Sequence, residues 1–166
     1  MKKSKRPATR IELQESNGQG ALNKIFRYCA YQERSHHEVK TKLLEYGLPS
    51  AEVEEIISHL ITEGFLNEER YAKAFAGGKF RIMKWGKLKI QRELESSGVS
   101  PRNIARGLAE ITPSEYSQTL LGLIKKKSKL VDDDNIYKKK NKVARFVIGK
   151  GYEPELVWET INDLMA

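Results

Sequence analysis

An internal repeat of apolar positions constrains the fold of this chain more than any other feature of its sequence. If Gly47, Gly98 and Gly151 are taken as equivalent, apolar residues stand in all three copies at offsets of −8, −4, +1, +6, +10 and +13. These residues are Val39, Ile90, Val143; Leu43, Leu94, Val147; Leu48, Val99, Tyr152; Val53, Ile104, Val157; Ile57, Leu108, Ile161; and Leu60, Ile111, Leu164. Because only 39% of the chain is apolar, agreement at all eighteen positions is far from chance.

The spacing within each copy predicts a helix, a glycine turn and a second helix. Offsets −8 and −4 mark one face of a helix that ends at the glycine, and offsets +6, +10 and +13 mark one face of the next. A further helical pattern precedes each pair; its residues are Leu22, Ile25, Phe26, Cys29; Tyr71, Ala72, Phe75, Ala76; and Tyr116, Leu120, Leu121, Ile124. Such a unit is small for an independent core, so neighbouring units should pack together. We therefore predict an all-α fold, an elongated array of three tandem three-helix repeats.

The expected organisation follows from these patterns. Residues 1–20 are basic and poor in apolar side chains, which predicts a disordered arm, with a short helix over 11–15 as the alternative. Helical repeats are expected over 21–66, 67–111 and 112–166.

Capping signals support the expected helix starts. Thr112-Pro113-Ser114-Glu115 and Ser35-His36-His37-Glu38 both read as capping boxes, and Ser100-Pro101 and Glu153-Pro154 as further starts. Segment 143–152 is rich in β-forming residues and is also compatible with a hairpin at Gly149-Lys150-Gly151. The repeat favours a helix there, and we predict one.

The sequence offers little for catalysis or metal binding. His36 and His37 are adjacent and cannot chelate as an i, i+4 pair would, so we expect both to face solvent. His59 is expected at the boundary of the core and Cys29 within it. Residues 132–135 lack the spacing of a calcium loop and predict a turn that caps the next helix. No phosphate-binding loop is present. We therefore predict no catalytic residue, no metal, no cofactor and no enzymatic activity.

Cysteine content and hydropathy indicate the compartment. One cysteine excludes an intrachain disulfide and favours a reducing environment. No apolar run approaches the roughly 20 residues that cross a bilayer. The N-terminus through Asn17 lacks the apolar stretch of a secretion signal. We expect a cytoplasmic protein without membrane contact, and a monomer.

The net charge of +8 is concentrated in two stretches. Residues 77–92 carry +6 with no acid, residues 125–150 carry +7, and residues 1–20 carry +3, which leaves −8 for the rest. Such an uneven distribution indicates an acidic partner that binds the protein through these basic stretches rather than over its whole surface. The candidate partner-binding residues are Lys79, Arg81, Lys84, Trp85, Lys87, Lys89, Arg92, Lys138, Lys139, Lys140, Lys142 and Arg145.

Aromatic residues make the first basic stretch more specific than the second. Phe80 and Trp85 are interleaved with its cations, and cations that flank a flat ring can grip a phosphate backbone or an acidic protein groove. The structural alternative for Trp85 is packing between repeats. For Lys125–Lys127 the alternative is an ordinary solvated helix face.

A motif in the centre of the chain carries a family resemblance. It runs Glu63-Gly64-Phe65-Leu66-Asn67-Glu68-Glu69-Arg70-Tyr71-Ala72, then Phe75, Trp85-Gly86, Ile90, Glu93-Leu94 and Gly98-Val99. Upstream, Ala21-Leu22, Ser35, Glu38-Val39, Lys42-Leu43 and Gly47 fit the same arrangement. The pattern resembles the RecX family of bacterial recombination regulators over about residues 20–165. The family often has aspartate where Asn67 stands and proline where Lys87 stands.

The resemblance implies a partner and an activity. Proteins of this family are all-helical and modular, and they bind the RecA recombinase, mostly as its filament on single-stranded DNA. It implies modulation, usually inhibition, of RecA's strand exchange, ATPase and SOS coprotease activities, and so a role in DNA repair and homologous recombination. Arg70 and Tyr71 match the motif, and we expect them to be structural, as a surface pair partner and a core aromatic.

Two other functions remain open at this point. One is a basic DNA-binding module whose helix pairs act as helix-turn-helix units, although no helix shows a base-reading face of Arg, Asn and Gln. The other is a structural helical adaptor with incidental charge. A regulator of RecA should bind nucleic acid alone only weakly and without sequence preference.

Overall fold

The computed structural model describes residues 17–166, and helices are the only regular elements in that range. Helix α2 begins at Asn17, so the last four residues of the predicted arm are helical rather than disordered. Packing of Leu22 and Ile25 stabilises this helix and outweighs the low helix propensity of Gly18 and Gly20. The rest of the arm, with the alternative helix over 11–15, lies outside the described residues.

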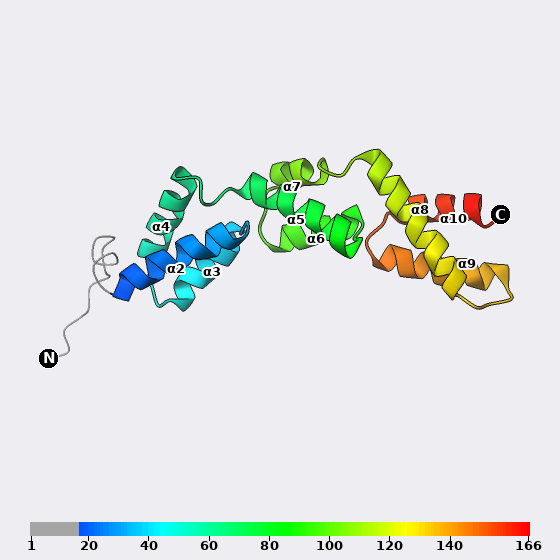
Figure 1. Cartoon of the computed structure of the whole chain (residues 1–166), viewed down its shortest axis with the longest axis horizontal. Coiled ribbons are helices and arrows are strands. Elements are labelled where there is room, and N and C mark those ends of the chain that lie inside the picture. The colour runs from blue at the N-terminus through cyan, green and yellow to red at the C-terminus, as the bar shows by residue number, and fades with distance from the viewer. Residues whose placement is uncertain (1–16) are drawn as a thin grey trace. The chain divides into compact units, whose positions relative to one another are not determined.

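The all-α class and the three tandem three-helix repeats are confirmed (Figure 1). The helices of the described chain are α2 (Asn17–Tyr31), α3 (His36–Glu45), α4 (Ser50–Thr62), α5 (Glu68–Met83), α6 (Lys87–Ser96), α7 (Pro101–Leu108), α8 (Pro113–Leu130), α9 (Ile136–Gly149) and α10 (Pro154–Leu164). Segment 143–152 lies mostly in α9, so the hairpin alternative is wrong.

Glycines end the helices as the repeat predicts. Gly47, Gly98 and Gly151 follow α3, α6 and α9 with φ of 83°, 76° and 102°. Gly64 plays the same role after α4 with φ of 79°. These left-handed conformations are open to glycine and costly for other residues. After α5, however, the residue with positive φ is Lys84, at 60°.

The predicted caps begin the helices. Thr112 and Glu115 form a reciprocal capping box, and the Ser35 and Ser100 hydroxyls accept from the third amide of α3 and α7. Glu153 stands at the N-cap of α10 without a side-chain capping bond. In residues 132–135, Asn135 caps α9, as expected of a capping turn.

The chain divides into two compact units, each described by itself below. The first unit consists of Met1–Tyr71 with Ser97–Val99, and the second of Ala72–Ser96 with Ser100–Ala166. The division falls inside α5, so the second and third repeats share one unit for nearly all of their length.

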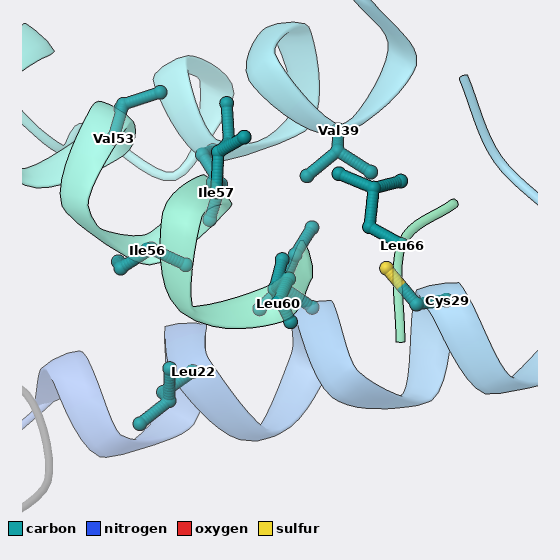
Figure 2. Packing of buried hydrophobic residues seen from close by; sticks show 10 residues of the cluster. Leu22, Cys29, Val39, Val53, Ile56, Ile57, Leu60 and Leu66 are labelled. Atoms are coloured by element: carbon teal, nitrogen blue, oxygen red, sulfur yellow. The ribbon is translucent and has the colours of Figure 1, made fainter. Parts of the chain in front are cut away.

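The first unit closes its own core over α2, α3 and α4. Its buried cluster includes Leu22, Val39 and Leu60, and Figure 2 shows Leu66, from the segment before α5, next to Val39. Cys29 is buried in this core, as predicted, and burial raises the pKa of its thiol to about 11.

The histidines of the first unit only partly follow the prediction. His59 is half-buried and meets the ring of Phe26 edge-on at 6.3 Å, as a boundary residue should. His37 is exposed, but His36 is half-buried, so the expectation of two solvent-facing imidazoles is wrong for His36. The reason is its spacing: His36 stands three residues before buried Val39 and shares its helix face.

In the second unit, α8 packs on α9 and α10, and α6 packs on α7. The repeat positions are buried here, with two exceptions: Leu108 is half-buried, and Leu164, the last residue of α10, is 38% exposed. The repeat pattern therefore located the core of this unit as well as that of the first.

The second and third repeats meet through backbone at two glycines. The Gly86 N–H donates to the Lys150 carbonyl at 2.8 Å, and the Leu88 N–H donates to the Gly151 carbonyl at 2.9 Å. A Cβ on Gly86 would lie 2.2 Å from the carbonyl carbon of Gly151. Only glycine at position 86 permits this approach, so the expected packing of neighbouring repeats is present between these two.

Candidate functional site

The ring of Trp85 organises two of the candidate lysines. It follows α5, is half-buried, and meets the ring of Phe75 at 6.4 Å between centroids. The ammonium groups of Lys79 and Lys89 lie 4.9 and 4.4 Å from the centroid of the indole ring. The contacts of Trp85 thus come from α5 and α6 of its own repeat. Cation–π attraction of this kind holds both ammonium groups near the ring.

The second aromatic of this stretch belongs to the core. Phe80 is 2% exposed and packs against Tyr116, with 6.0 Å between ring centroids. It is therefore not available to a partner, and Trp85 is the aromatic that accompanies the cations.

Lys87 is held by the third repeat. Its N–H donates to the Tyr116 hydroxyl at 3.1 Å, and its ammonium lies 4.7 Å from the Tyr116 ring centroid. The same hydroxyl donates to the Glu153 carboxylate at 2.7 Å. Burial raises the pKa of Tyr116 far above its ordinary value, and the bond to Glu153 adds to this effect. The hydroxyl therefore stays protonated, and Lys87 is a structural residue as well as a candidate contact.

Several candidate cations are already engaged. Arg81 pairs with Glu115 at 3.6 Å, and Lys142 pairs with Asp133 at 3.0 Å. The hydrogen bond from Lys142 lowers the pKa of Asp133, which keeps the pair charged. Lys140 donates to the Asn162 side chain at 3.4 Å.

Other candidates have no carboxylate partner. Lys84 and Arg92 form no ion pair within the described residues, and neither do Lys138, Lys139 and Arg145. Lys84, Arg92, Lys139 and Arg145 therefore keep positive charges that no carboxylate of the described residues is recorded to pair, whereas the charge of Lys138 acts on Asp133 and helps to lower its pKa.

The second basic stretch is split by the structure. Lys138, Lys139, Lys140 and Lys142 lie in the first half of α9. Lys150 follows the other end of the helix, about 16 Å from Lys139 at the usual rise per residue. Sequence neighbours in this stretch therefore belong to different surfaces.

Lys150, which the sequence did not single out as a contact, meets the first basic stretch and is joined there by Phe146 and Lys127. The ammonium of Lys150 donates to the Met83 carbonyl at 3.1 Å and lies 5.8 Å from the centroid of the Phe146 ring. Lys127 covers the same ring at 4.4 Å. We call Ile82, Met83, Lys84, Lys127, Phe146 and Lys150 the α5–α9 surface. The one sequence feature that belongs to this surface is the glycine turn at Gly151. The sequence does not show which other segment that turn contacts.

The residues of the central motif are structural, as expected. Arg70 pairs with Glu33 and donates to the Gly64 carbonyl at 2.9 Å. Tyr71 is 6% exposed, and burial raises its pKa to about 12. Asn67 caps α5 by accepting from the Arg70 N–H at 2.9 Å.

Metal-binding clusters and membrane-spanning helices are both absent from the described residues. Within residues 17–166, no group of three or more His, Cys, Asp or Glu side chains is arranged to hold a metal ion. No helix of that range is both long enough and apolar enough to span a bilayer.

Comparison with known proteins gives one consistent result. Family models described as the first, second and third three-helix domains of RecX match residues 21–60, 67–108 and 114–161. The curated regulatory protein RecX of Geobacillus kaustophilus is 27% identical over 143 residues, which are 86% of this chain and 53% of the relative. That of Bacillus cereus (strain B4264) is 26% identical over 146 residues, 88% of this chain and 54% of the relative. The chain thus spans about half the length of these relatives.

A solved structure supports the same fold. The crystal structure of RecX from Lactobacillus salivarius superposes with a TM-score of 0.79 and 23% sequence identity. The superposition covers 88% of this chain and 95% of that one.

Proposed function

The chain belongs to the RecX family, and we propose that it binds the RecA recombinase, chiefly as the filament on single-stranded DNA, and inhibits its activities. These are strand exchange, ATP hydrolysis and stimulation of SOS repressor cleavage. The protein acts in the cytoplasm, in DNA repair and recombination, and it acts by occupying a surface rather than by catalysis. The curated relatives are named regulatory proteins, which agrees with a role of this kind.

The observation that carries the proposal is the set of unpaired cations on the second unit. Charges without an intramolecular partner are the ones that an acidic surface can neutralise at no cost to the fold. Lys84 and Arg92 offer such charges in the first basic stretch, and Lys139 and Arg145 offer them on α9.

Repetition explains the preference for filament over free RecA. Tandem repeats can contact neighbouring protomers at once, and each further contact is then intramolecular. Binding to free RecA forgoes this gain. Nucleic acid alone is expected to bind weakly, with strong salt dependence and no sequence preference.

The first test measures RecA strand exchange and ATP hydrolysis on single-stranded DNA, with and without the protein. We expect both activities to fall as the protein approaches the filament in concentration. No effect at stoichiometric excess would contradict the proposal. Tight, sequence-selective binding to DNA without RecA would instead support the helix-turn-helix alternative.

The second test locates the contact by charge reversal. Lys84→Glu with Arg92→Glu should weaken filament binding by about tenfold or more, because both charges lack internal partners. The matched control is Arg27→Glu with Arg102→Glu, which changes the net charge equally on exposed sites outside the candidate set. An equal loss in both proteins would mean that overall charge, not this site, governs binding.

A further inference from the structure

The α5–α9 surface combines exposed apolar side chains with cations. Ile82 and Met83 end α5 and are 79% and 47% exposed, and Phe146 on α9 is 38% exposed. The ammonium of Lys150 touches both helices, since it donates to the Met83 carbonyl and lies near the Phe146 ring. Lys150 therefore links the end of α5, where Ile82 and Met83 lie, to Phe146 on α9.

The cations around these side chains have no carboxylate partner. Lys84, Lys127 and Lys150 form no ion pair among the described residues, whereas Arg81 nearby is paired with Glu115. Apolar side chains framed by unneutralised ammonium groups match a partner that is acidic and also carries an apolar anchor.

The Phe146 and Trp85 rings are poorly placed for nucleic acid. Binding to single strands relies on rings whose faces are open to stack on bases. Here two ammonium groups lie against the Phe146 ring, at 4.4 and 5.8 Å, and two against the Trp85 ring. The open apolar groups of the α5–α9 surface are the aliphatic Ile82 and Met83, which suit an apolar side chain better than a base.

The backbone at Lys84 supports a role for its side chain. Lys84 adopts φ of 60° at a helix end where every other left-handed position of the described chain is glycine. Its carbonyl is held by the Tyr152 hydroxyl at 3.0 Å. A lysine kept in a conformation that favours glycine, in the middle of this surface, indicates that its ammonium is used.

We propose that the α5–α9 surface binds an acidic protein segment that places an apolar side chain on Ile82 and Met83. The inference deepens the proposed function and rests on it for the identity of the partner: the contact is to the protein part of the filament, not to its DNA. Its chemistry is independent of that identity and is tested without RecA.

The experiment uses the full chain and three fluorescent probes of equal charge. The first is a helix-forming peptide of glutamate and leucine, the second has serine in place of leucine, and the third is oligothymidylate. We expect wild-type protein to bind the leucine peptide about tenfold more tightly than either other probe. Ile82→Ser with Met83→Ser should remove this preference and leave binding to the serine peptide unchanged.

The control variant is Leu130→Ser with Ile136→Ser. These side chains are 71% and 46% exposed, closely matching Ile82 and Met83, and lie outside the α5–α9 surface, at the last residue of α8 and the first of α9. This variant should keep the preference for the leucine peptide, and circular dichroism should show both variants folded.

Three results would overturn the inference. They are equal binding of the two peptides, tighter binding of oligothymidylate, and a preference that survives in the Ile82→Ser, Met83→Ser protein. Failure of the proposed function is a separate result: a retained peptide preference with no effect on RecA would assign the surface to another acidic protein.

Discussion

The two units use the same three-helix repeat in different ways. Residues 20–71 of the first unit hold nine acidic and six basic residues, and several of these charges pair internally, as in Lys40–Glu54 and Arg70–Glu33. The second unit holds nineteen basic and eleven acidic residues and leaves several cations unpaired. The shared helical pattern therefore determines the fold, while the charges outside it separate a self-contained unit from a binding unit.

Cohesion differs as well as charge. One repeat closes the core of the first unit, whereas two repeats form the second unit and meet through backbone contacts at Gly86 and Gly151.

Each unit also carries its own reporter. The single cysteine, Cys29, lies in the first unit, and both tryptophans, Trp85 and Trp158, lie in the second. Thiol reactivity and tryptophan fluorescence can thus follow the two units separately.

The largest expected effect comes from Gly86→Ala, which should break the second unit alone. The new Cβ would lie 2.2 to 2.3 Å from backbone atoms of Gly151 and Tyr152, which no side-chain rotation relieves. We expect the second unit to lose about 3 kcal/mol or more of stability, seen as an earlier fluorescence transition in urea.

In the same Gly86→Ala protein, Cys29 should stay as slow to react with a thiol reagent as in the wild type. Exposure of Cys29 together with the fluorescence change would contradict the separation of the units. The matched control is Gly64→Ala in the first unit, where the new Cβ meets nothing within 4 Å. Its φ of 79° limits the expected cost to about 1 kcal/mol.

A smaller effect is expected from Tyr116→Phe, which removes one oxygen from the contact between the second and third repeats. The change leaves the Lys87 N–H without its acceptor and Glu153 without its donor. We expect a loss of about 1–3 kcal/mol in the fluorescence transition. Tyr137→Phe, at a ring that is 74% exposed, should change it by less than about 0.5 kcal/mol. Equal shifts in the two variants would show that the hydroxyl contact is not stabilising.

The smallest effect is expected from Lys84→Gly, which should raise the stability of the second unit and lower the affinity of the protein for the filament. Glycine relieves the left-handed conformation, for a net gain of roughly 0.5–1 kcal/mol in the second unit. Filament affinity should fall because the ammonium is lost. Lys84→Ala is the control, since it removes the same charge and keeps the conformation, so it should weaken binding without the gain. Unchanged filament affinity in both would exclude Lys84 from the contact.

The sequence predicted those features that depend on local pattern. Offsets from Gly47, Gly98 and Gly151 located the helices and nearly all of the core, and capping residues located their starts. The sequence did not predict which segments far apart in the chain come into contact. Nothing in the spacing says that Gly86 meets Gly151, and therefore nothing brings Lys150 to Met83 or splits the second basic stretch.

Lys87 illustrates the same limit. The RecX family often has proline at this position, and a substitution there looks conservative for a helix start. In this chain the Lys87 N–H has an acceptor in the third repeat, the Tyr116 hydroxyl, which a proline could not use. Only the contact between the repeats reveals the difference.

The start of α6 has a consequence for hydrogen exchange. First-turn amides of a helix lack internal acceptors and usually exchange with solvent first. Here the N–H groups of Gly86, Lys87 and Leu88 all donate to the third repeat. In deuterated water α6 should therefore lose its amide protons from its C-terminal end first. Deuterium uptake at these three amides would then time the separation of the second repeat from the third.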